Sequence, residues 1–82
     1  LEELQCNKNN ITHLDNLPQS LEKLYCENNK ITHLGNLPQN LKELYCQINK
    51  ITEFDNLPAS LEKLVCFGNP LTYTFLITIE NI

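Results

Sequence analysis

A repeat of twenty residues is the feature that most constrains how this chain can fold. The unit reads Leu-x-x-Leu-x-Cys-x-x-Asn-x-Ile-Thr-x-Leu-x-Asn-Leu-Pro-x-x, with a few apolar substitutions, and it recurs at Cys6, Cys26, Cys46 and Cys66. A unit this short cannot enclose a hydrophobic core, so it must bury its apolar side chains against the units before and after it. The fixed period therefore predicts a solenoid, a stack of similar coils.

Apolar spacing within one unit predicts a short strand followed by an irregular return. In the second unit Leu24 and Cys26 alternate with polar or aromatic residues, which is the period of a strand with one buried face. Ile31 and Leu34 are expected to point back into the core. Pro38 disfavours a helix at the end of the unit, so we expect extended or turn segments and few or no helices on the return side.

These units resemble the leucine-rich repeat, whose signature Leu-x-x-Leu-x-Leu-x-x-Asn-x-Leu occurs here with Cys at the third apolar position. The twenty-residue length and the Leu-Pro pairs are similar to a short class of bacterial repeats. The Asn- and Ile-rich units with Cys in the core are similar to arrays in giant viruses and protists. The resemblance implies a solenoid of the α/β horseshoe class. It also implies a right-handed coil, a parallel β-sheet on the concave face and a protein-binding role.

The chain length limits the protein to one domain. Its 82 residues are expected to form repeats at 1–20, 21–40 and 41–60 and a partial repeat at 61–72. The segment 73–82 departs from the pattern and is expected to be an atypical tail or a C-terminal cap. Because the chain starts on the first leucine of a repeat, we expect it to be a fragment of a longer array. We also expect it to be a monomer.

Charge and hydropathy argue against nucleic acid and membrane as partners. The net charge is -4 and the six basic residues are spread through the repeats, whereas phosphate binding needs clustered Lys and Arg. The longest largely apolar stretch, Phe75 to Ile79, is far shorter than the ~20 residues of a membrane span. We expect neither partner.

The four cysteines could form a metal or disulfide set. Their spacing, however, places Cys6, Cys26, Cys46 and Cys66 in one inward column on adjacent strands, and parallel side chains do not converge on one zinc ion. We expect free buried thiols that act as small hydrophobic groups, and no cofactor. Unpaired thiols favour an intracellular, reducing compartment.

A second column contains Asn9, Asn29, Asn49 and Asn69, where each strand ends. These amides could contact a ligand, but buried backbone groups at a turn need partners. We therefore expect a structural ladder of amides that bond the turn backbones.

A third column, His13, His33 and Glu53, has the composition of a metal site with two histidines and one carboxylate. Three outward side chains in a line rarely surround one ion, so solvated surface is the better interpretation. The chain also lacks a recognisable nucleophile with a base, and it lacks a glycine-rich phosphate loop. We expect no enzymatic activity.

The concave face is where the sequence indicates function. Its outermost column, Glu3, Lys23, Glu43 and Lys63, alternates in charge. The next two columns become aromatic and apolar toward the C-terminus: Gln5, Tyr25, Tyr45, Val65 and Asn7, Glu27, Gln47, Phe67, with Ile48 at the edge. We predict a protein-binding surface made by Tyr25, Tyr45, Gln47, Val65 and Phe67. In the alternative, the tail folds over Val65 and Phe67 as a cap.

The predicted function is protein–protein interaction through the concave sheet of a longer solenoid. Within that surface the two tyrosines are expected at the centre and the charged column at the rim. Two alternatives remain open from the sequence. The chain could be a structural spacer without a dedicated ligand, or the substrate-recognition arm of a multidomain enzyme, as in bacterial relatives that join such repeats to a ligase domain.

Overall fold

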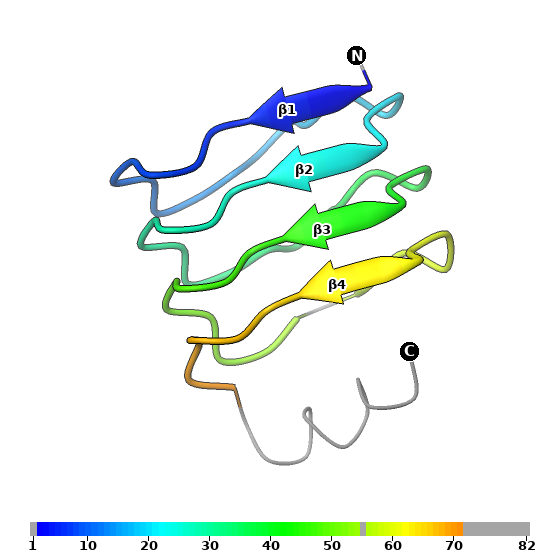
Figure 1. The fold of residues 1–82 in the computed structure, drawn as a ribbon. Coiled ribbons are helices and arrows are strands. Elements are labelled where there is room, and N and C mark those ends of the chain that lie inside the picture. The colour runs from blue at the N-terminus through cyan, green and yellow to red at the C-terminus, as the bar shows by residue number, and fades with distance from the viewer. Residues whose placement is uncertain (1, 55, 72–82) are drawn as a thin grey trace.

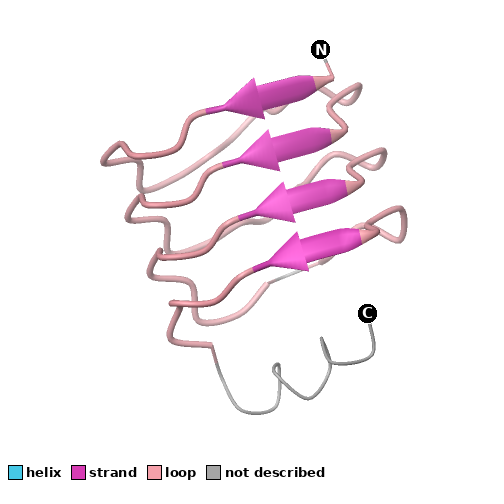
Figure 2. Ribbon diagram, viewed as in Figure 1, coloured by secondary structure: helices cyan, strands magenta, loops and turns pink. Residues whose placement is uncertain are grey.

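The computed structural model describes residues 2–54 and 56–71. Four short parallel strands form one sheet in chain order (Figure 1). They are β1 (Glu3–Gln5), β2 (Lys23–Tyr25), β3 (Glu43–Tyr45) and β4 (Lys63–Val65). Strands and loops make up the whole described part of the chain, and no helix occurs in it (Figure 2). The predicted stack of coils with a parallel sheet and a non-helical return is therefore confirmed.

The register of the sheet equals the period of the sequence. Leu4 pairs with Leu24, Leu24 with Leu44, and Leu44 with Leu64. Backbone bonding continues past the strand ends, where the Cys26 N–H donates to the Tyr45 carbonyl at 2.8 Å. Each column of the repeat in the sequence is consequently a column of neighbouring side chains in space.

The hydrophobic core runs through the stack, and its side chains are most completely buried in the middle coils. Leu24, Cys26, Leu44 and Cys46 have no exposed surface. The matching residues of the first and fourth coils are only partly buried. This gradient follows from the architecture, because a coil is fully enclosed only when it has a neighbour on both sides.

The turn after each strand has a left-handed backbone at one fixed position. Lys8, Asn28, Ile48 and Gly68 occupy it, with φ of 59°, 59°, 58° and 73°. Glycine and asparagine adopt this conformation readily, but a β-branched residue there is an outlier. Asn16 and Asn36 occupy a second left-handed position, before the Leu-Pro pairs, at φ of 54° and 53°.

Two further predictions concern the C-terminal tail and a possible membrane span. The expected tail or cap at 73–82 lies outside the described residues. Across 2–54 and 56–71, the structure contains no helix long and apolar enough to cross a membrane.

Candidate functional site: the open face of the sheet

The strands divide their side chains between the core and one solvent-facing surface, which we call the open face. The central leucine of each strand points into the core, and its two neighbours lie on the opposite face. The open face therefore carries the columns that begin with Glu3, Gln5 and Asn7. We include the turn column of Lys8, Asn28, Ile48 and Gly68 as its edge.

Alternating charges occupy the first column of the open face, as the register requires. Glu3 pairs with Lys23, and Glu43 lies between Lys23 and Lys63. The Lys23 Nζ is 3.8 Å from the Glu43 Oε2, and both side chains are partly exposed. Exposed pairs of this kind contribute only ~0.2–1 kcal/mol, so this column adds little to stability.

Tyr25 and Tyr45 stack on each other in the second column. Their ring centroids are 4.6 Å apart and the rings are parallel within 1°. The Tyr45 hydroxyl donates a hydrogen bond to the Glu43 carboxylate, and the Lys63 Nζ lies 5.5 Å from the Tyr45 ring centroid. Hydrogen bonding to Glu43 raises the pKa of Tyr45 to about 12 and lowers the pKa of Glu43.

This arrangement gives the two tyrosines a role within the sheet beside the predicted role in binding. In the structure both rings are half-buried and contact each other, so removal of either ring also removes packing from the sheet.

Two side chains of the third column end in unpaired oxygens. The Oε1 atoms of Glu27 and Gln47 are buried without a hydrogen-bond partner among the described residues. The backbone carbonyls of the same two residues accept weak hydrogen bonds from Asn29 and Asn49 at 3.4 Å. The backbone is thus held in place while the side-chain acceptors remain unused.

The C-terminal end of the open face exposes large apolar side chains. Phe67 is 64% exposed and Ile48 is 48% exposed, and these are the large hydrophobic side chains most open to solvent among the described residues. The two residues are joined by a hydrogen bond from the Ile48 N–H to the Phe67 carbonyl at 2.9 Å. Val65 is half-buried next to them.

Behind the open face, the asparagine column bonds neighbouring coils together. The Asn49 Nδ2 donates to the Cys46 carbonyl of its own coil at 3.0 Å and to the Cys26 carbonyl of the preceding coil at 3.1 Å. Its Oδ1 accepts from the Ile31 N–H at 3.0 Å. Asn29 makes the same contacts one coil earlier. Each amide therefore joins two coils through the backbone.

The cysteine column lies beside this ladder. All four thiols are free, and those of Cys26 and Cys46 are fully buried. Burial raises the pKa of the Cys26 thiol to about 12 and raises the pKa of Cys46 in the same direction. Across 2–54 and 56–71, no group of three or more His, Cys, Asp or Glu residues could hold a metal ion.

The histidine column of the sequence analysis lies on the surface. His13, His33 and Glu53 are all exposed, and the His13 Nδ1 is 3.0 Å from the Thr12 hydroxyl. The structure does not bring the three side chains together as a metal site.

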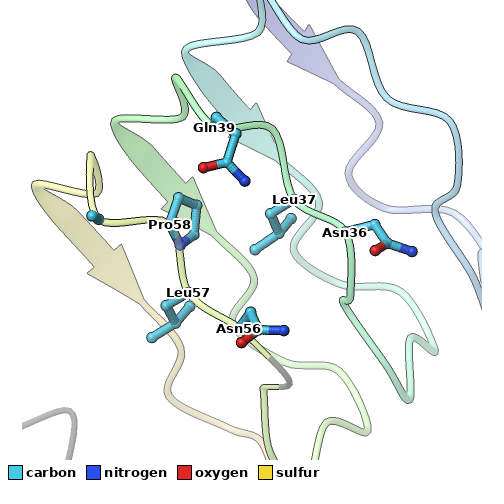
Figure 3. A pocket seen from close by; sticks show the side chains of 7 residues that line it. Asn36, Leu37, Gln39, Asn56, Leu57 and Pro58 are labelled. Atoms are coloured by element: carbon cyan, nitrogen blue, oxygen red, sulfur yellow. The ribbon is translucent and has the colours of Figure 1, made fainter.

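A groove that the sequence analysis missed lies between the second and third coils (Figure 3). Its volume is about 320 Å³. Seven side chains line it: Asn36, Leu37, Gln39, Asn56, Leu57, Pro58 and Ala59. None of them is charged, so the groove lacks the acid, base or nucleophile that catalysis would need. The available signal was Ala59, which stands where the earlier units have the longer Gln19 and Gln39.

Comparison with known proteins agrees with this geometry. The family model described as leucine-rich repeats, in two copies, matches residues 19–59, which is half of the chain. Searches of curated proteins and of solved structures gave no significant match. Domains of the matched family generally mediate protein–protein interaction and are typically non-enzymatic. The repeat pattern, the four-stranded parallel sheet and the family match together show that this chain belongs to the leucine-rich repeat proteins.

Proposed function

We propose that this chain binds a protein partner through the open face, with Tyr25, Tyr45, Gln47, Val65 and Phe67 in the contact and Ile48 at its edge. The observation that carries the proposal is the exposure of Phe67 and Ile48 next to each other, at 64% and 48%. Adjacent large apolar side chains on a polar surface mark interaction sites, because a partner that covers them removes apolar area from water.

The backbone at Ile48 supports this assignment. Its φ of 58° is unfavourable for a β-branched residue. Asn28 and Gly68 occupy the same position in the neighbouring coils with residues that suit the conformation. An unfavourable residue that is also half-exposed is better explained by an intermolecular contact than by packing.

The stacked tyrosines would serve this contact as a rigid anchor. Tyr25 and Tyr45 are already held by each other, and Tyr45 is also fixed by Glu43 and Lys63. A partner that contacts their edges would order few additional torsions, and pre-ordered side chains reduce the entropic cost of association.

The proposal includes a reducing, intracellular compartment and a protein as the partner. Free thiols at Cys6 and Cys66 are only half-buried and would be exposed to oxidation outside the cell. Nucleic acid is a poor fit to the open face, because Lys23 already lies beside Glu43 and Lys63 beside Tyr45.

Photo-crosslinking tests the proposal. Benzoylphenylalanine placed at position 67 should capture one partner protein from an extract of the source cells, and the same group at position 33, on the histidine column, should not. Binding of the purified partner should then weaken at least about tenfold in Phe67→Ser, as expected for loss of a hot-spot aromatic ring. Capture at position 33 with none at position 67 would place the contact on the other side of the coil.

A further inference from the structure

The groove between the second and third coils lies where the chain departs from its own repeat. The penultimate position of the unit is Gln19 in the first coil and Gln39 in the second, but Ala59 in the third. Figure 3 shows the side chains of Leu37 and Gln39 on one chain segment and that of Pro58 on the next, so the groove runs between two neighbouring segments. The shorter side chain at position 59 leaves this space open.

The amide side chains that line the groove are not used to join the coils. The adjacent Ser60 is used in this way, because its hydroxyl donates to the Gln39 and Leu41 carbonyls of the preceding coil, each at 2.7 Å. Within residues 2–54 and 56–71, by contrast, the side-chain amides of Asn36, Gln39 and Asn56 take part in no hydrogen bond. Three carboxamide groups around the groove are therefore available to a ligand.

The groove carries no charge and is backed by apolar side chains. Leu37 is 4% exposed, and Leu57 and Pro58 are half-buried. A charged ligand would lose its hydration here without meeting an opposite charge. A wholly apolar ligand would cover the amides and leave them unpaired. The lining therefore favours a neutral ligand that has hydrogen-bond donors and acceptors beside apolar groups.

From these contacts we infer that the groove binds an extended, uncharged segment of a partner protein through the main chain of that segment. Each peptide group has one N–H and one C=O, and the carboxamides of Asn and Gln offer the matching acceptor and donors. The volume of about 320 Å³ is at the lower end of the range for ligand pockets. It suits a few extended residues and is too small for a helix, which is about 10 Å wide.

The groove and the open face are separate surfaces. The segments 36–39 and 56–59, which lead from one coil to the next, line the groove. The strands and the turns that follow them form the open face. The inference therefore adds a binding site to the proposed function and does not depend on it.

A titration with short peptides, followed by two-dimensional NMR of the folded chain, tests this inference. The probe is acetyl-Ala-Val-Ala-N-methylamide. One control carries a methyl group on the valine nitrogen, which removes a main-chain donor, and a second control has glutamate in place of valine. The probe should give saturable shifts at Leu37, Gln39 and Ala59 in the millimolar range, and both controls should bind more weakly. No saturable shift up to about 10 mM probe, equal affinity of the N-methylated peptide, or shifts confined to Tyr25 and Phe67 would overturn the inference.

Two pairs of matched variants locate the site, with the fold of each variant checked by its NMR spectrum. Ala59→Gln restores the residue of the earlier coils and should abolish saturable binding of the probe, because the longer side chain occupies the groove. Ala59→Ser keeps the side chain small and should retain the affinity. Gln39→Glu keeps the shape but exchanges the amide for a carboxylate, and it should weaken binding about threefold or more, as expected for one lost hydrogen bond.

Gln19→Glu makes the same exchange outside the groove and should leave the affinity of the probe unchanged. Unchanged affinity in Ala59→Gln, or equal losses in Gln39→Glu and Gln19→Glu, would also overturn the inference. Such a failure leaves the crosslinking at position 67 unaffected, so the proposed function is judged separately.

Discussion

Ile48 and Asn49 are neighbours in the chain, yet they belong to two regions that use their side chains differently. Asn49 belongs to the interior ladder, where every coil has asparagine because each amide bonds backbone groups of two coils. Ile48 belongs to the edge of the open face, where the coils share only a left-handed backbone. The column there reads Lys8, Asn28, Ile48 and Gly68. Residue identity is thus uniform where the backbone depends on the side chain, and it varies where only the conformation is shared.

The same contrast separates the middle of the stack from its ends. Asn49 is 6% exposed, whereas Asn9 is exposed and its amide nitrogen donates to carbonyls of its own coil, those of Cys6 and Asn7. Stability should therefore depend on the interior columns of the second and third coils. Side chains of the open face outside the tyrosine stack and the left-handed turn should be able to change with little effect on folding.

The largest expected effect is alkaline unfolding through the buried thiols. The pKa of Cys26 is raised from 9.0 to about 12 in the folded chain. Its contribution to stability is therefore complete below pH 9 and is lost as pH rises toward 12. For one thiol the loss is ~1.4 kcal/mol per pH unit in this window.

Urea unfolding at pH values from 8 to about 11 measures this loss. Cys26→Ala should have a shallower decline with pH than the unchanged chain, because one of the buried titrating groups has been removed. Cys66→Ala, which alters a half-buried thiol, should change the slope less. Identical slopes in all three proteins would mean that the buried thiols do not control the alkaline limit.

The next largest effect is expected at the interior ladder. Asn49→Ala leaves the Ile31 N–H and the carbonyls of Cys26 and Cys46 without their side-chain partner. The free energy of unfolding should fall by ~1–3 kcal/mol. Asn9→Ala is the matched control and should cost less, since its amide nitrogen donates within its own coil. Equal urea midpoints for the two variants would contradict the expectation that the asparagine ladder stabilises the middle of the stack more than its end.

A smaller effect is expected at the edge of the open face. Gly68 has a φ of 73°, and a Cβ there would lie 3.1 Å from the Ile48 Cγ1 and 3.3 Å from its Cα. Gly68→Ala should therefore cost ~1–2 kcal/mol, the penalty for a side chain in the left-handed region. Gly35, whose φ is not positive, provides the control, and Gly35→Ala should be neutral or slightly stabilising in the same thermal melt. Similar losses of stability in the two variants would contradict the assignment of the effect to the left-handed backbone at Gly68.

Much of this fold could be predicted because the period of the repeat equals the register of the sheet. Once Leu24 pairs with Leu44, every column of the sequence becomes a column in space. That rule placed the cysteines, the asparagines and the charged rim next to their neighbours. It also made Tyr25 and Tyr45 adjacent.

Side-chain contacts and backbone conformations could not be predicted from the repeat period, because they depend on individual torsion angles. Adjacency did not predict that Tyr45 takes Glu43 and Lys63 as partners. The left-handed position of Ile48 was also missed. Asn28 and Gly68 in its column were the available signal, since both residue types favour positive φ.

The most direct test of the account is the stability of Ile48→Asn, measured by urea unfolding beside the unchanged chain. Asparagine is the residue that the second coil uses at this position, at a φ of 59°. We expect the substitution to raise the free energy of unfolding by ~1 kcal/mol, because it relieves a β-branched residue in the left-handed region. The same variant should bind the partner less well. A lower midpoint would contradict the account, since it would mean that Ile48 is kept for packing within the fold and not for the surface it exposes.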